Sequence, residues 1–228
     1  WDFNTHTLTQ VGLTALWLIM EFNDKVATLL LDGNDVGARA DDSVGLGRAM
    51  VTAPALRKLS LSNNKLGDLK NEMRKFARGL SSNTTLTHLD VANNGLGPDG
   101  VKIICVALKS CISLKVLDIS YNTPGRDAAL AELFRVHQSL ESVGVIEKEP
   151  QTRMERTFHL DARGKEAIGR ALLASKTHQI RFVQCDVFSL TSKVTTLNWK
   201  TSSQSDAVML AGVLRSNNVL TALHVGSG

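Results

Sequence analysis

The chain lacks an apolar run long enough to cross a membrane, and it has no low-complexity tract. Its longest apolar stretch, residues 13–20, includes Thr14 and is far shorter than the about 20 residues that a membrane helix needs. The three cysteines, Cys105, Cys111 and Cys185, contain no C-x-x-C pair, which excludes a disulfide scaffold and favours free thiols. An apolar fraction of 43% excludes disorder. We therefore expect a soluble globular protein of a reducing, cytoplasmic compartment.

Motifs for catalysis, nucleotide hydrolysis and metal binding are also missing. The histidines show no H-E-x-x-H spacing, and no G-x-x-x-x-G-K-[ST] segment occurs. The Gly-x-Gly at Gly45 and Gly47 has Met50 where a dinucleotide-binding loop needs a third glycine. The net charge of +4 is too small to require nucleic acid as a partner. We expect no enzyme activity, no cofactor and no metal.

What the sequence does contain is an internal repeat. Apolar residues recur at offsets 0, 3, 5 and 10, with asparagine at offset 8. The copies are Val26, Leu29, Leu31, Asn34 and Val36; Leu56, Leu59, Leu61, Asn64 and Leu66; and Leu86, Leu89, Val91, Asn94 and Leu96. A fourth copy, Leu114, Leu117, Ile119 and Asn122, has Pro124 at its last position. The period is about 30 residues, which indicates a solenoid of stacked units.

Each unit reads as a strand, a turn and a helix. Offsets 3 and 5 alternate inward on a short strand, while the asparagine lies where the chain turns and can bond backbone groups through its amide. The stretch with Met73, Phe76 and Leu80 has apolar residues at helical spacing. One unit cannot bury its own apolar face, so we expect stacked units with a parallel sheet on the concave side and helices on the convex side.

The pattern L-x-x-L-x-L-x-x-N-x-L at this period resembles the leucine-rich repeat family, in particular its long, helix-containing, ribonuclease-inhibitor-like class. The segment from Leu96 to Leu114, with Cys105 and Cys111, is especially similar to that class. The resemblance implies an α/β fold, a right-handed horseshoe-shaped solenoid. It also implies that protein contacts are the usual role and that the cysteines are reduced.

The pattern changes after residue 140. Offsets 0, 3 and 5 recur at Leu140, at Ile180 and at Leu220, so the step lengthens to about 40 residues. We expect one solenoid over residues 1–228, with the regular repeats in 1–140 and the longer, irregular repeats in 141–228. The extra segments end in the triplets 158–160 and 197–199, which we interpret as strands of hairpins at one rim.

Both ends of the sequence suggest that it is a fragment of a longer array. It does not begin with Met, and it stops three residues after the apolar position Val225. The predicted helix over residues 11–22 is apolar nearly all round, which suits burial on two sides better than a polar end cap. Further repeats or a partner domain are therefore expected beside it.

The residues between the inward positions define a predicted concave face. Most of its ionised side chains are carboxylates, and Lys58 is its only permanent cation. We expect a protein partner, favouring one with a basic segment, and no nucleic acid bound on this face or membrane contact. The candidate binding residues, with Tyr121 and Phe182 as candidate anchors, are Asp32, Lys58, Ser60, His88, Asp90, Asp118, Tyr121, Phe182, Gln184 and Asp186.

A protein-binding scaffold that uses the concave face and rim hairpins is the leading hypothesis for function. Three alternatives stay open, because a fold does not determine a function. The chain could be an architectural part of an axonemal or cytoskeletal assembly, or the sensor arm of a NOD-like receptor. It could also be a GTPase-activating protein similar to the Ran GTPase-activating family. The sequence predicts neither the partner nor the oligomeric state.

Overall fold

Short strands and helices alternate along the chain, as the repeat predicts. The computed structural model describes residues 1–4, 6–38, 40–68, 73–125, 128–146, 160–201 and 203–227. The strands are β1 (Thr28–Leu30), β2 (Lys58–Ser60), β3 (His88–Asp90), β4 (Val116–Asp118), β5 (Ser142–Gly144), β6 (Phe182–Gln184), β7 (Ser189–Leu190), β8 (Thr196–Thr201) and β9 (Ala222–Ser227). The helices are α1 (Gln10–Phe22), η1 (Val36–Ala38), α2 (Ala40–Thr52), α3 (Met73–Ser82), α4 (Gly97–Leu108), α5 (Ala129–Val136), α7 (Ala162–Ala174) and α8 (Gln204–Leu214).

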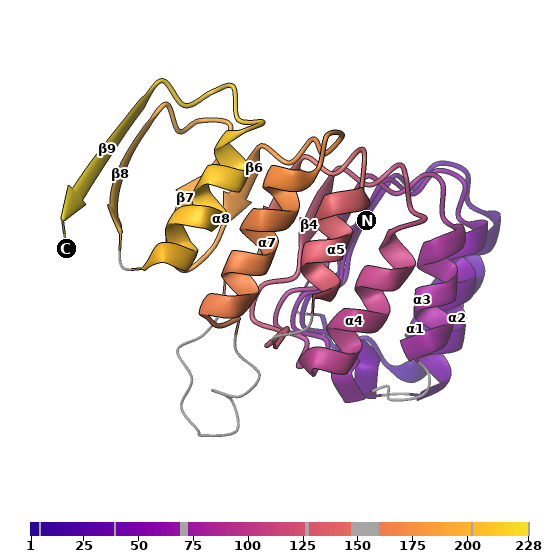
Figure 1. Cartoon of the computed structure of the whole chain (residues 1–228). Coiled ribbons are helices and arrows are strands. Elements are labelled where there is room, and N and C mark those ends of the chain that lie inside the picture. The colour runs from indigo at the N-terminus through magenta and orange to yellow at the C-terminus, as the bar shows by residue number, and fades with distance from the viewer. Residues whose placement is uncertain are drawn as a thin grey trace.

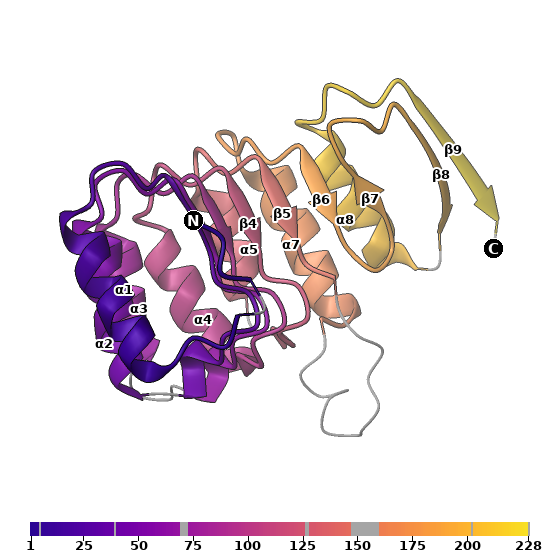
Figure 2. The same ribbon diagram turned by 180° about the vertical axis from the view of Figure 1, so that it is seen from behind.

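The strands form one layer and the helices form the other (Figures 1 and 2). Strands β1 to β6 are parallel neighbours in chain order, and β7 adds to β6 in the antiparallel sense. The register follows the repeat, because Leu29 pairs with Leu59, Leu59 with Leu89 and Leu89 with Leu117. The predicted α/β solenoid with a parallel sheet is therefore confirmed.

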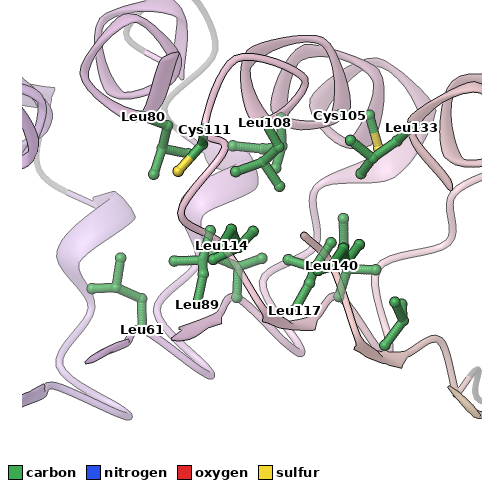
Figure 3. Packing of buried hydrophobic residues seen from close by; sticks show 14 of the residues in the cluster. Leu61, Leu80, Leu89, Cys105, Leu108, Cys111, Leu114, Leu117, Leu133 and Leu140 are labelled. Carbon is green, nitrogen blue, oxygen red and sulfur yellow. The ribbon is translucent and has the colours of Figure 1, made fainter. Parts of the chain in front are cut away.

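The core fills the space between the two layers (Figure 3). Leu89 and Leu117 point from the strands towards Leu80 and Leu108 on the helices, and all four are buried. The free cysteines Cys105, Cys111 and Cys185 are buried as well. Burial of apolar area in this layer is the main favourable term for the fold, at about 25 cal/mol per Å².

A ladder of buried asparagines joins successive turns, and its members are Asn34, Asn64, Asn94 and Asn122. The Oδ1 of Asn64 accepts the backbone N–H of Asn34 at 3.0 Å and that of Val36 at 3.2 Å. Its Nδ2 donates to the carbonyl oxygen of Leu31 at 2.8 Å. The same bonds recur at the two later members of the ladder. Each side chain thus bonds the turn of the preceding repeat.

The register corrects part of the sequence interpretation after residue 140. The longer step does exist between β5 and β6, since Ser142 pairs with Phe182. Strand β9, however, pairs with β8 and not with β6, and Leu197 lies opposite Leu223 in parallel. The hairpin expected at residues 197–199 is therefore wrong: this segment is itself a repeat strand, followed by α8. The other predicted rim segment is 147–160. Residues 147–159 lie outside the described residues, and Leu160 is buried in the core.

The sheet is interrupted after β7, while the helix layer continues into α8 (Figure 1). Glycines let α7 and α8 approach closely: a Cβ at Gly169 would lie 2.4 Å from the carbonyl oxygen of Val208. At Gly212 it would lie 2.7 Å from the carbonyl oxygen of Gly169. The β8–β9 pair lies beyond α8 and stands apart from the first sheet (Figure 2).

At the N-terminal side, residues before α1 extend the sheet and one side of α1 is exposed. Asp2 forms a parallel bridge with Leu30. One side of α1 is buried and consists of Leu13, Leu16, Trp17 and Met20. Its exposed residues include Val11 and Phe22, which are 79% and 86% exposed. Further repeats or a partner beside this helix remain a prediction.

Replacing Asn94 by alanine tests the ladder. The change removes the acceptor for the N–H groups of Asn64 and Leu66 and the donor to the carbonyl of Leu61. Each buried polar group that loses its partner costs about 1–3 kcal/mol, so we expect a loss of at least about 3 kcal/mol in the free energy of unfolding, measured by urea titration. The exposed Asn218 is the control, and Asn218→Ala should change stability by less than about 0.5 kcal/mol. Equal effects would show that the ladder is not a main constraint.

Candidate binding surface

Two rows of side chains cover the sheet face that points away from the helices, which we call the strand face. The first row is Thr28, Lys58, His88, Val116, Ser142 and Phe182. The second row is Leu30, Ser60, Asp90, Asp118, Gly144 and Gln184. The rows are set by strand alternation, because the residues between them, such as Leu89 and Leu117, are buried against the helices.

The structure thus brings most of the predicted site residues together on one face. Seven of the candidates lie in the two rows: Lys58, Ser60, His88, Asp90, Asp118, Phe182 and Gln184. Asp32 lies just after β1, where its Oδ1 accepts the hydroxyl of Ser60 at 2.6 Å and the N–H of Ser62 at 2.9 Å. The strand face therefore extends to Asp32.

Tyr121 and Asp186, the remaining two candidates, lie in other surroundings. Tyr121 lies in the turn after β4 with a φ of +59°, and it is 38% exposed. It has the same turn position as Asn63 and Asn93, which places it at the edge of the strand face. Asp186 pairs with Lys165 of α7 at 2.8 Å, and Lys165 also lies 3.4 Å from Asp206 of α8. This ion-pair group joins the end of β6 to the first turns of two helices.

Carboxylates gather in the second row. The Oδ1 atoms of Asp90 and Asp118 each accept a backbone N–H two residues further on, from Ala92 and Ser120, both at 2.9 Å. Gly144 makes room for its neighbour: a Cβ there would lie 2.7 Å from Oδ1 of Asp118. The side chain of Asp118 therefore leans over β5, where the second row has no side chain of its own.

Partial burial changes the ionisation of Asp90, and neighbouring negative charge adds to the effect. Partial burial raises its pKa from 3.8 to about 6, and the carboxylates of Asp118 and Asp32 act in the same direction. The hydrogen bond from Ala92 and the charge of Lys58 oppose this shift. Above pH 6 the second row carries a partly buried negative charge that the fold does not fully compensate.

A groove of about 400 Å³ lies beside these carboxylates, across β3 to β7. Its lining residues are His88, Lys115, Val116, Glu141, Ser142, Phe182, Gln184, Leu190, Thr191 and Ser192. Burial and the nearby charges of Lys58 and Lys115 lower the pKa of His88, so the imidazole is neutral at pH 7. Both apolar and polar residues line the groove.

Ion pairs organise one wall of the groove. Glu141 lies 3.5 Å from Lys115 and 2.6 Å from Arg181. The guanidinium of Arg181 lies 5.4 Å from the ring centre of Phe182, within cation–π range. Sequence reasoning missed Lys115 and Glu141, which precede their strands by one residue. Both residues directly follow the first apolar position of their repeat, and this shared position could have predicted that they lie side by side.

Neither a metal centre nor a membrane-spanning helix occurs in the described part of the chain. Among these residues, histidine, cysteine and carboxylate side chains form no group of three that could hold a metal ion. No helix in the same ranges is long and apolar enough to span a membrane.

Comparisons with known proteins identify the repeats. Family models described as leucine-rich repeats match residues 55–76 and 82–105. The structure of LegL7, a leucine-rich repeat-containing protein from Legionella pneumophila, superposes with a TM-score of 0.56 at 16% identity, over 99% of this chain and 72% of that one. Two segments of the chain therefore match leucine-rich repeats, and the fold is that of a leucine-rich repeat solenoid.

Two other similarities are partial. The structure of leiomodin-1 actin-binding site 2 has a TM-score of 0.50 at 14% identity, over 72% of this chain and 90% of that one. The mouse centrosomal protein of 78 kDa is 34% identical over 65 residues, which is 28% of this chain. The match spans only 8% of the mouse protein.

The raised pKa of Asp90 predicts a pH-dependent gain from Asp90→Asn, which keeps the acceptor for Ala92. A folded-state pKa above the unfolded value means that wild-type stability is lost as the pH rises from 3.8 to about 6, so the loss is only partial at pH 5. We expect the variant to gain about 1 kcal/mol at pH 7.5, discounted for partial exposure, and clearly less at pH 5.

Urea unfolding at the two pH values measures this gain. Asp24→Asn, at an exposed carboxylate with 70% of its side-chain surface accessible, is the control and should change stability by less than about 0.5 kcal/mol at both pH values. An equal gain from Asp90→Asn at pH 5 and pH 7.5 would contradict the assignment.

Proposed function

We propose that this chain is a non-catalytic protein-interaction module that binds an extended segment of a partner on the strand face. The observation that carries the proposal is the strand face itself. Its two aligned rows consist of exposed and half-buried residues, apart from the buried Ser60 and Gly144, and a groove lies across β3 to β7. Stacked repeats create extended surfaces of this kind, which suit protein partners better than small substrates.

The chemistry of the face supports the same proposal. The strand face holds partly buried carboxylates in its second row and apolar residues such as Val116 and Phe182 in its first. Apolar anchors beside polar groups are typical of protein interfaces. Phosphate backbones would meet repulsion from Asp32, Asp90 and Asp118, so we propose a protein partner and not nucleic acid. The buried free thiols agree with a reducing, cytoplasmic setting, which is part of the proposal.

We further propose that the repeats are of the ribonuclease-inhibitor-like class. Helices α3 and α4 lie between successive strands, and β1, β2 and β3 follow one another at the period of the regular repeat. Helix-containing repeats of this length are what that class requires. Protein contacts are the common role of the class.

An architectural role in a cytoskeletal assembly is the second candidate. The observation that favours it is the 65-residue similarity to a protein named as centrosomal. The leiomodin-1 structure is named for actin binding, but at 14% identity that similarity concerns the fold alone. Nothing in the described residues specifically favours GTPase activation or a receptor sensor arm.

Affinity purification with two matched triple variants tests the proposed function. Thr28→Arg, Val116→Arg and Ser142→Arg together cover the first row, while Thr52→Arg, Val106→Arg and Leu173→Arg add the same charge on the exposed side of the helices. We expect proteins captured by wild type to fall at least tenfold with the first variant and to persist with the second. This follows because the bulky charged side chains would block access to the strand face.

Mass spectrometry identifies the captured proteins, and binding of the purified partner then gives the change in Kd. Thermal unfolding checks that both variants fold. Loss of capture with the helix variant, and its persistence with the first-row variant, would move the binding surface to the helix layer and overturn the proposal.

A further inference from the structure

We propose that the strand face recognises a two-residue signature in its partner. The groove across β3 to β7 receives one large apolar side chain, and Asp90 with Asp118 receives a lysine or arginine from the same extended segment. This inference rests on the proposed function and names the chemistry of its partner.

The shape of the groove supports a single large side chain. Val116 of β4 and Phe182 of β6 supply half-buried apolar surface, and Ser142 of β5 lies between them in the sheet. A volume of about 400 Å³ is at the lower end of the range for ligand pockets. It accommodates an aromatic or aliphatic side chain together with the adjoining backbone.

Strand β7 closes the groove on one side. It runs antiparallel to β6, with Val183 opposite Leu190, and the chain then turns through Thr191 and Ser192 along the groove wall. The regular repeats on the other side, from β5 back to β3, leave the strand face continuous. A partner segment would therefore cross β3, β4 and β5 and place its apolar side chain against the wall.

The carboxylates of Asp90 and Asp118 each lie two residues along their strand from a residue that lines the groove. Asp118 follows Val116 by two residues on β4, and Asp90 follows His88 by two residues on β3. Two residues along a strand span about 6.6 Å, which a lysine or arginine beside the apolar anchor can bridge. Gly144 removes the side chain that would separate Asp118 from the β5 side of the groove.

The charges differ between the groove and the second row. Beside the groove, Glu141 already pairs with both Lys115 and Arg181. In the second row, Asp90 and Asp118 each accept a backbone N–H, and their negative charges act on one another. A cation from the partner would relieve that repulsion, whereas an acidic segment would add to it. Charge complementarity thus selects a basic side chain for this position.

Selection from a phage-displayed library of random dodecapeptides tests the inference. Wild type, Ser142→Trp and Thr28→Trp are the immobilised targets. Ser142→Trp fills the groove, while Thr28→Trp is the matched control at the same row position on β1, outside the groove lining. We expect wild type to enrich peptides that carry an aromatic or large aliphatic residue within two positions of a lysine or arginine. Their binding should fall at least tenfold on Ser142→Trp and stay unchanged on Thr28→Trp.

A double-mutant cycle with one synthetic enriched peptide tests the charge contact. Replacing its basic residue by glutamine should weaken binding to wild type about tenfold, and the difference should disappear on the Asp90→Asn, Asp118→Asn variant. Asparagine keeps the backbone acceptors in that variant, so the fold should survive, and a thermal melt of each protein checks this.

Three outcomes would overturn the inference. They are the absence of enriched peptides, enrichment of acidic peptides, and peptide binding that both tryptophan variants weaken equally. None of these outcomes would contradict the proposed function, because a protein can bind the strand face without this signature. The affinity purification of intact partners tests the proposed function separately. Loss of strand-face dependence in that capture experiment would contradict the proposed function itself.

Discussion

The asparagine ladder is the constraint on which the strand face depends. Each repeat must turn sharply at the end of a strand of only three residues, and the turn leaves backbone groups that water does not reach. The amides of Asn64, Asn94 and Asn122 satisfy these groups in the preceding repeat. Because each bond crosses from one repeat to the next, the ladder fixes the stagger of the strands. It thereby aligns the side chains of the first and second rows.

Regular stacking of the repeats also explains why two carboxylates lie next to each other and why the pKa of Asp90 is raised. Asp90 and Asp118 stand side by side because Leu89 pairs with Leu117, not because the carboxylates attract one another. The apolar core, which faces the helices, supplies the free energy that holds two like charges at neighbouring strand positions. The raised pKa of Asp90 is thus a consequence of repeat geometry. Binding surfaces on stacked repeats can be electrostatically unfavourable in the free protein for the same reason.

The fold was largely predictable from sequence where its repeats are regular, and less so where they are not. Offsets 3 and 5 identified Leu59 and Leu89 as inward residues, and offset 8 identified the ladder, because these roles need one residue type at one place. The longer step after Ile180 was misleading, since Val194, Leu197 and Trp199 show the same offsets within it. Two weakly matching strand patterns compete there, and pairing between β8 and β9 decides the outcome.

The candidate surface was likewise predictable where it lies on regular repeats and not predictable where the repeats are irregular. Strand alternation was enough to place Lys58, His88 and Asp118 on one face, because it depends only on the repeat. The groove was not predictable, because its wall is β7, a strand of two residues that folds back on β6 and has no counterpart in the regular units. Asp186 lies apart for a related reason: Lys165, on a helix 21 residues earlier, draws it into an ion pair.

The irregular part of the solenoid therefore makes one place on the strand face different from the rest of that face. Identical repeats present the same surface at every strand, so a bound segment could slide by one repeat at little cost. Here β7 closes one side of the groove, and Gly144 opens the second row next to it. The helix layer continues through α7 and α8, so the break in the sheet is supported from behind by Gly169 and Gly212. A partner segment bound as proposed would therefore take its register from the place where the repeat pattern ends, which is also where sequence periodicity carries least information.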